Sequence, residues 1–321
     1  MPDSSIEQRL AVLTDSHEQG RLAVTDGVAL RYCRWMPVNP RGRVLLLSGR
    51  GGFLEKYYST VIRLLERGLE VVSFDWRGQG LSSRLLADCQ RGHVDDFVDY
   101  IADLDRIWTE LFQSPADTDN YLLAHSMGAH VALRWLREKQ AGRAAFRHAW
   151  LTAPLFGIDT RPYPLAVAKA LAAMVCVVGG HQRYVFGGGP YRPETYRKEG
   201  LANLSSDSQQ MEYELACLQQ DPALQLGSPT FGWLRAGFRS MSCLHSRGYV
   251  EQIEQPITQF VAGDELVVNN AACADVQRRL PHGELLTIPV AKHDLLIEKG
   301  ALQAPLWNKI DRQLSADFDA D

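Results

Sequence analysis

Several features that would mark a specialised class of protein are missing from this sequence. Its 34 Lys and Arg residues are balanced by 38 Asp and Glu residues, giving a formal net charge of −4. No cationic surplus is available to hold a phosphate backbone, so we expect no nucleic-acid partner. The six cysteines are far apart, without a C-x-x-C pair or nearby histidines at zinc-site spacing. We therefore interpret them as reduced, mostly buried thiols and expect no metal site.

Membrane-targeting and membrane-spanning segments are also lacking. Residues 1–19 carry four acidic side chains and no apolar core, which is unlike a secretory signal, so we expect a cytoplasmic protein. The longest apolar stretch, residues 164–180, is interrupted by Lys169. It falls short of the roughly 20 residues that a membrane-spanning helix needs. We expect this stretch to touch a bilayer at most.

What is present is ordinary globular composition, with 321 residues of which 45% are hydrophobic. This length fits two domains or one large domain with an insertion. Asp26-Gly27 lies between two extended segments and predicts an edge hairpin. Further along, short apolar segments separated by helical patterns predict an α/β fold, with a mostly parallel central sheet and helices on both faces. These predicted strands cover residues 44–47, 70–74, 121–124, 149–152, 257–262 and 284–288.

The strand and helix alternation stops after the fourth of these strands and resumes near Ile257. Such a lapse is typical of an insertion into a parallel-sheet domain. We expect a core formed by residues 1–157 and 249–321, interrupted by a mainly helical cap at residues 158–248.

The strongest chemical signal is Ala124-His125-Ser126-Met127-Gly128, at the end of an apolar strand and the start of a helix. Apart from its first residue, it matches the G-x-S-x-G nucleophile elbow. Small residues are needed on both sides because the turn is tight and strains the backbone of the nucleophile. The motif therefore predicts Ser126 as a nucleophile.

A serine hydroxyl needs a base, and the base needs a carboxylate that holds its tautomer. In this fold the carboxylate precedes the histidine in the chain, and both follow the serine. His293 comes after the last predicted strand, whereas His282 precedes that strand and fits a surface turn. Asp264 follows the preceding strand, so we prefer it as the acid, with Glu265 as the alternative. We expect Asp294 to face solvent.

Acyl transfer also needs hydrogen-bond donors for the oxyanion. We expect these to be the backbone N–H groups of Met127, directly after the nucleophile, and of Arg50 in the Gly-rich loop at residues 48–52. Asp75 also follows a strand, but it precedes Ser126, and we interpret it as a turn-stabilising carboxylate paired with Arg77.

In these motifs the chain resembles the serine α/β-hydrolases of the monoacylglycerol lipase and lysophospholipase group. The resemblance implies an α/β-hydrolase fold and hydrolysis of the acyl ester of a single-chain lipid, a lysophospholipid or a monoacylglycerol, without metal or organic cofactor. The alternatives are a small-ester carboxylesterase or a peptidase on the same fold, or a binding protein without turnover. The segments that carry the resemblance are residues 75–82, 91–97, 123–128, 152–157, 186–192 and 229–234.

The resemblance makes the insertion a cap over the site, and two interpretations of its apolar run at residues 165–178 stay open. The run is a helix buried between cap and core, or it is a wall of the acyl-chain tunnel or an exposed patch that docks on membrane lipid. The last of these would bring the protein to the inner membrane as a peripheral protein. We expect Arg183 and Arg192 nearby to be solvated rather than bound to a lipid phosphate.

Overall fold

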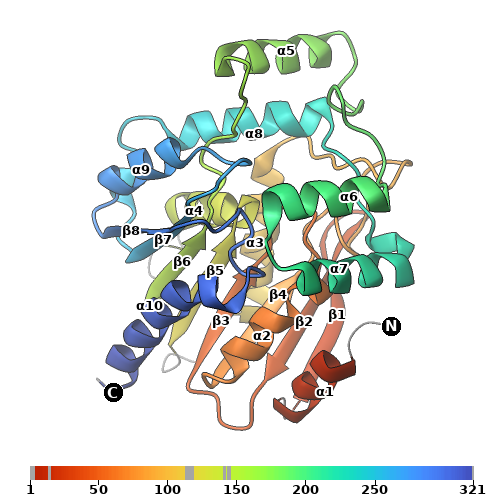
Figure 1. Cartoon of the computed structure of the whole chain (residues 1–321). Coiled ribbons are helices and arrows are strands. Elements are labelled where there is room, and N and C mark those ends of the chain that lie inside the picture. The colour runs from red at the N-terminus through yellow and green to blue at the C-terminus, as the bar shows by residue number, and fades with distance from the viewer. Residues whose placement is uncertain (1–3, 14–15, 113–118, 140–141, 143–145, 320–321) are drawn as a thin grey trace.

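A single eight-stranded sheet forms the centre of the molecule (Figure 1). The computed structural model describes residues 4–13, 16–112, 119–139, 142 and 146–319; residues 1–3 and 14–15 of the N-terminal segment lie outside this set. The strand order is β1-β2-β4-β3-β5-β6-β7-β8, and all pairs from β4 to β8 are parallel. The strands are β1 Ser16–Thr25, β2 Val28–Met36, β3 Gly42–Leu47, β4 Leu69–Phe74, β5 Asn120–His125, β6 His148–Thr152, β7 Ile257–Ala262 and β8 Gly283–Ile288.

This arrangement confirms the expected mostly parallel sheet. The two N-terminal strands pair antiparallel with each other, and β2 pairs antiparallel with β4. Gly27, in the turn between β1 and β2, has a φ of 74°, which glycine adopts without strain. The hairpin expected at Asp26-Gly27 is therefore also confirmed.

Helices cover both faces of the sheet (Figure 1). Alternate residues of β3 point to opposite sides, so Val44 and Leu46 belong to one buried cluster and Leu45 and Leu47 to the other. The first cluster is completed by α2 and α10, and the second by α3, α4 and α9. The bounds of the helices outside the insertion are α1 Ser4–Leu13, η1 Leu54–Tyr57, α2 Tyr58–Leu65, α3 Phe97–Ile107, η2 Trp108–Phe112, α4 Met127–Glu138, η6 Val250–Gln252, α9 Asn270–Arg279 and α10 Gly300–Phe318.

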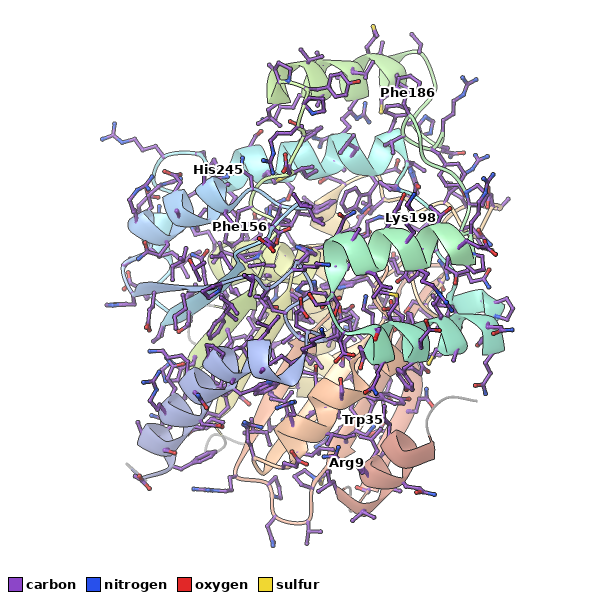
Figure 2. All side chains as sticks on the ribbon, viewed as in Figure 1. Arg9, Trp35, Phe156, Phe186, Lys198 and His245 are labelled. Atoms are coloured by element: carbon purple, nitrogen blue, oxygen red, sulfur yellow. The ribbon has the colours of Figure 1, made fainter. Side chains whose placement is uncertain are left out.

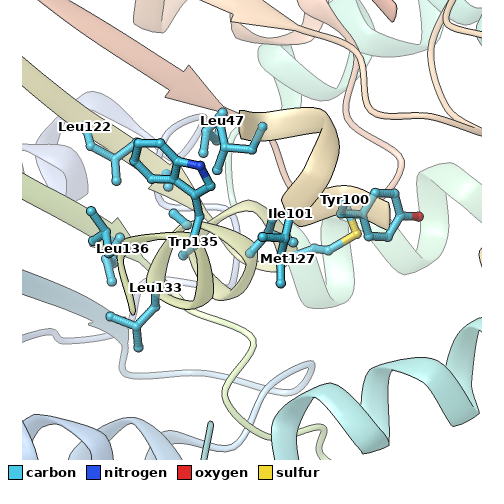
Figure 3. Close-up of a cluster of buried hydrophobic side chains, with 14 of the residues drawn as sticks. Leu47, Tyr100, Ile101, Leu122, Met127, Leu133, Trp135 and Leu136 are labelled. Carbon is cyan, nitrogen blue, oxygen red and sulfur yellow. The ribbon is translucent and has the colours of Figure 1, made fainter. Parts of the chain in front are cut away.

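The helix that starts after Ser126 is anchored firmly in the core. Met127 and Trp135 of α4 lie fully buried in the same cluster as Leu47 and Leu122 of the sheet (Figure 3). Full burial of one such side chain stabilises a fold by about 1.5–3 kcal/mol. The elbow in front of α4 is thus held by a rigid strand and a rigid helix.

The turn after β4 is held by two separate ion pairs. The Asp75 carboxylate accepts two backbone N–H groups, at 2.9 and 2.8 Å, and lies 3.0 Å from Nε of Arg31. Arg77 instead makes two hydrogen bonds of 2.6 Å to Asp103. The interpretation of Asp75 as a turn-stabilising carboxylate fits, but the expected pairing with Arg77 is wrong because the two side chains leave the turn toward different elements.

Between β6 and β7 the named elements are all helical. Of these, α8 packs on α3, and its Trp233 and Ala236 join the main core cluster. The insertion is therefore mainly helical, as expected, while its boundaries at residues 158 and 248 stay a prediction. Its elements are α5 Leu165–Val177, α6 Pro193–Glu199, η4 Gly200–Leu204, α7 Ser208–Gln220, η5 Pro222–Leu224 and α8 Phe231–Leu244.

The apolar helix α5 lies at the outer edge of the molecule, on top of α8 (Figure 1). Of its residues only Ala172 and Cys176 are buried, while Val167, Met174 and Val177 are exposed. The interpretation of this run as a helix buried between cap and core is therefore wrong. None of the helices in the part of the chain that the structure describes could cross a bilayer. The six cysteines, all within that part, form no disulfide.

Candidate active site

Ser126 occupies a strained turn between β5 and α4. Its φ is 51°, in the left-handed region that side-chain-bearing residues rarely adopt. Two backbone hydrogen bonds hold the turn: Ser126 N–H donates to the carbonyl of Thr152 at 2.9 Å, and its carbonyl accepts from Leu155 N–H at 3.0 Å. The expected elbow geometry is thus present.

Small residues allow the neighbouring loop to approach this turn. A Cβ at Gly128 would lie 2.5 Å from the Ser48 carbonyl oxygen, and one at Gly49 would lie 3.1 Å from the Ser126 Cβ. A larger residue at Gly128 would require the backbone to shift, and one at Gly49 would require its neighbours to move slightly. The Gly-rich loop therefore packs directly against the elbow.

His293 lies within hydrogen-bond distance of both a nucleophile and a carboxylate. Its Nε2 is 3.0 Å from Ser126 Oγ, and its Nδ1 is 2.9 Å from Glu265 Oε2. All three side chains are at least nine-tenths buried. This is the serine, histidine and acid arrangement in which the acid orients the imidazole and the imidazole takes the serine proton.

The carboxylate in contact with His293 is Glu265, so our preference for Asp264 is wrong. Asp264 is exposed, and its backbone N–H donates to the Ala291 carbonyl at 2.9 Å. Glu265 points inward, where its Oε1 accepts the N–H groups of Val267 and Val268 at 2.8 and 3.1 Å. These bonds leave Oε2 free to meet the imidazole.

The surroundings keep Glu265 ionised. Burial alone would raise the pKa of its carboxyl group, but the hydrogen bond and charge of His293 and the two backbone N–H donors outweigh that effect. The net result is a pKa below the usual value. A carboxylate that is charged at neutral pH is what an orienting partner of histidine requires.

Both expected oxyanion donors are placed consistently with that role, which stays a prediction. Met127 is the first residue of α4, so its N–H is among the helix N–H groups without an intrahelical acceptor. Arg50 lines the same pocket as Ser126 and His293. In the same loop, the Gly51 N–H is already bonded to Gln79 Oε1, at 2.5 Å.

A buried charge cluster that we did not predict lies beside the triad. Lys56 Nζ is 3.0 Å from Glu214 Oε1 of the cap and 3.0 Å from Asp294 Oδ2, and all three side chains are buried. Burial would lower the pKa of Lys56, but the two carboxylates raise it well above its usual value. Asp294 therefore does not face solvent as expected, and no short motif in the sequence announces this long-range contact.

The triad opens into a pocket of about 240 Å³. Leucine side chains form much of its wall, together with Tyr57, Tyr191 and Tyr196; the leucines are Leu204, Leu218, Leu224 and Leu226. An adjoining pocket of about 630 Å³ shares Arg50 and both cap tyrosines and is lined further out by Arg192 and Glu199. His282 lies elsewhere, exposed and 3.8 Å from Glu254, as its surface interpretation predicted.

Comparison with curated proteins supports the resemblance drawn from the motifs. The chain is 28% identical to lysophospholipase L2 of Escherichia coli (strain K12) over 303 residues, which cover 91% of this chain and 86% of that protein. It is also 28% identical to the probable lysophospholipase L2 of Haemophilus influenzae over 279 residues, or 86% of this chain and 84% of that protein. The resemblance to the lysophospholipase group is thereby confirmed, and these relatives narrow it to bacterial lysophospholipase L2.

Solved structures and family models agree on the fold. A soluble variant of monoglyceride lipase from Saccharomyces cerevisiae superimposes with a TM-score of 0.74 at 19% identity, covering 94% of this chain and 96% of that one. At this identity the likeness concerns the fold, which is that of an α/β-hydrolase. The model of the Hydrolase_4 family, described as serine aminopeptidase S33, matches residues 38–300. The chain therefore belongs to this family of serine α/β-hydrolases.

Proposed function

We propose that the protein hydrolyses the acyl ester of a single-chain lipid through an acyl-enzyme formed on Ser126. The observation that carries this proposal is the hydrogen-bonded series from Ser126 Oγ to His293 Nε2 and from His293 Nδ1 to Glu265, set in a pocket with leucine walls. The names of the lysophospholipase relatives support the substrate class.

In the first half of the reaction, Ser126 Oγ attacks the ester carbonyl carbon and its proton passes to His293 Nε2. Glu265 stabilises the resulting imidazolium through Nδ1. The backbone N–H groups of Arg50 and Met127 donate to the oxyanion, an interaction whose loss costs about 10²–10³ in kcat for a single donor. The intermediate collapses, and the leaving alcohol takes the proton from His293.

In the second half, a water molecule gives its proton to His293 and attacks the acyl carbon. The second tetrahedral intermediate releases the fatty acid, and Ser126 Oγ recovers its proton from His293. The same residues therefore serve both halves, and the chain's own side chains account for every proton transferred.

The shape and lining of the pocket favour a lipid over a small ester. An acyl chain gains about 0.8 kcal/mol for each methylene group that it buries, and the leucine-lined wall offers such a surface beside Ser126. A small-ester carboxylesterase or a peptidase on the same fold is the second candidate. The description of the family as serine aminopeptidase is the reason to test peptidase activity as well.

Substrate profiling and active-site labelling test the proposal together. We expect turnover of lysophospholipids and monoacylglycerols to exceed that of acetate esters and of aminoacyl amides. We also expect a fluorophosphonate probe to label the wild type but not Ser126→Ala, which should have lost turnover. A strong preference for acetate esters or amides would contradict the lipid assignment, and a folded wild type without labelling or turnover would indicate a binding protein.

We further propose that the cap contacts a membrane surface through α5, which would supply lipid to the site. Large apolar side chains are exposed on this helix and on the segment that follows it, among them Val167, Met174, Val177 and Phe186. Phe186 lies at the same end of the molecule as α5 (Figure 2). Exposed apolar side chains gathered on one helix are typical of interfacial anchors. This association would make the protein a peripheral one at the inner membrane.

A further inference from the structure

The side chain of Arg50 carries a charge that no carboxylate neutralises. Within the described parts of the chain, no Asp or Glu lies within ion-pair distance of its guanidinium. Its Nη2 donates to the Gly227 carbonyl at 2.7 Å, whereas its Nε is buried without a hydrogen-bond partner. The group also lies over the Trp233 ring, 5.5 Å from the centroid. A half-buried cation without a carboxylate partner is costly unless something else supplies the opposite charge.

A glycine, Gly92, lies directly against the guanidinium of Arg50. A Cβ at Gly92 would lie 2.2 Å from Arg50 Nη2, so a larger residue at this position would require the guanidinium to move. Burial lowers the pKa of Arg50 to about 10, which still leaves the side chain charged at neutral pH. The charge is thus maintained in a place where the protein alone does not balance it.

The location of Arg50 connects this charge to the substrate. Arg50 follows Gly49, which packs against the elbow, and it lines both the pocket that contains Ser126 and the larger adjoining pocket. An ester bound at Ser126 would keep its acyl chain against the leucine side chains of the smaller pocket. Its headgroup would then lie in the smaller pocket or extend into the larger one. A headgroup in the larger pocket passes Arg50 first.

We propose that the Arg50 guanidinium binds the phosphate of a single-chain phospholipid and thereby makes the enzyme prefer lysophospholipids to monoacylglycerols. This inference rests on the lipid-ester hydrolysis proposed above. The guanidinium has a fork of donors that matches phosphate geometry, and no carboxylate among the described residues already occupies it. Neutral monoacylglycerol offers no negative charge and leaves Arg50 unbalanced.

Two features of the larger pocket fit the same headgroup. Arg192 adds a second positive charge at the outer wall, and Glu199 adds a carboxylate that suits the ammonium of an ethanolamine or choline group. Arg192 is exposed, however, so water screens its charge, and an exposed pair contributes little to binding. Arg50 is only half-exposed, so water screens its charge less, and it is therefore the specificity-determining group.

The test compares kcat/KM for lysophosphatidylethanolamine with kcat/KM for monoacylglycerol of the same acyl chain. We expect the wild type to favour the phospholipid, and Arg50→Met to lower the ratio of the two values by about 10- to 100-fold. Arg50→Lys, which keeps the charge but not the fork, should give an intermediate ratio. Arg183→Met, an exposed cap arginine outside both pockets, is the matched control and should leave the ratio unchanged.

Binding measurements keep the test decisive if Arg50→Met loses turnover altogether. In a Ser126→Ala background, an ether analogue of the lysophospholipid should bind more weakly by a similar factor when Arg50 is Met, whereas an ether analogue of monoacylglycerol should not. The inference would be overturned if both ether analogues lost the same affinity when Arg50 is Met, or if the ratio of the two kcat/KM values did not change. It would also be overturned if that ratio depended on Arg192 and not on Arg50. A wild type that hydrolyses no lipid ester would instead contradict the proposed function.

Discussion

The Lys56 ammonium lies 3.0 Å from the carboxylate of Asp294, the residue that follows the histidine of the triad. The same ammonium lies 3.0 Å from Glu214 on the cap helix α7. One buried cation therefore joins three parts of the chain: the segment after the Gly-rich loop, the cap and the loop that carries His293. Because this ammonium balances two buried carboxylates, removing it leaves two buried negative charges without a partner, which destabilises the folded protein.

We predict that Lys56→Met lowers the free energy of unfolding by about 3–5 kcal/mol, since it leaves buried carboxylates without a partner. Urea denaturation monitored by tryptophan fluorescence measures the change. Lys139→Met is the matched control, because Lys139 pairs with Asp105 at the surface, 3.3 Å apart, and exposed pairs contribute about 0–1 kcal/mol. Equal effects of the two substitutions would show that burial does not set the strength of the Lys56 pair.

Substitutions at the adjacent residues Glu265 and Asp264 show which of the two is the acid that partners His293. Glu265→Gln should reduce kcat by about 10³- to 10⁴-fold, because an amide no longer stabilises the imidazolium of His293. Asp264→Asn should change kcat by less than about twofold, as expected of an exposed side chain. Steady-state hydrolysis of one lipid ester suffices for both variants. The reverse order of effects would return the role to Asp264.

Stability should fall as the pH is lowered, because two histidines are buried in their neutral form. Burial lowers the pKa of His125 to about 4 and that of His130 to about 3. Below a pH of about 6.5 the unfolded chain binds these protons and the folded chain does not, so each histidine removes roughly 2 kcal/mol of stability between about pH 7 and pH 5.

Urea denaturation at the two pH values checks this dependence. His130→Gln should lose less unfolding free energy than the wild type between pH 7 and pH 5, by the roughly 2 kcal/mol that one histidine contributes. His17→Gln, at an exposed position on β1, should lose as much as the wild type. If His130→Gln and the wild type lost the same stability on acidification, His130 would not be the group responsible.

The proposed membrane contact predicts a position-dependent effect of one added charge. Val167→Asp and Val177→Asp, on the outer face of α5, should each weaken binding to phosphatidylethanolamine and phosphatidylglycerol vesicles by about tenfold or more. Val38→Asp changes an equally exposed valine in the loop after β2 and should leave vesicle binding as it was. Co-sedimentation gives the comparison, and equal binding by all three variants would exclude α5 as the contact.

Much of the fold could be predicted because local pattern and global structure agree. The short strands β3, β4 and β7 are buried on both faces along their whole length, which is why they form continuous apolar runs in the sequence. Ser126 could be found because its tight turn constrains the residues beside it. His293 followed from its place after the last strand.

The acid illustrates what the sequence leaves open. Asp264 and Glu265 are adjacent, and the pattern of the strand before them does not say which one points inward; in the structure Glu265 contacts His293 and Asp264 is exposed. The solvent exposure of α5 could not be predicted either, because the apolar composition of a helix does not say whether the core or water surrounds it. The pairing of Lys56 with Asp294 depends on residues distant in sequence, which no motif brings together.

The hydrogen bonds that the cap makes to the histidine loop limit how the enzyme admits a substrate. His293 and Asp294 donate their backbone N–H groups to the carbonyls of Asn203 and Leu204 in η4, at 3.4 and 2.7 Å. A cap that swung away as one rigid lid would pull these carbonyls off the loop and disturb the base that it holds. The inner part of the cap is thus tied to the loop that carries His293, and we expect a lipid to enter past it from the side of the larger pocket.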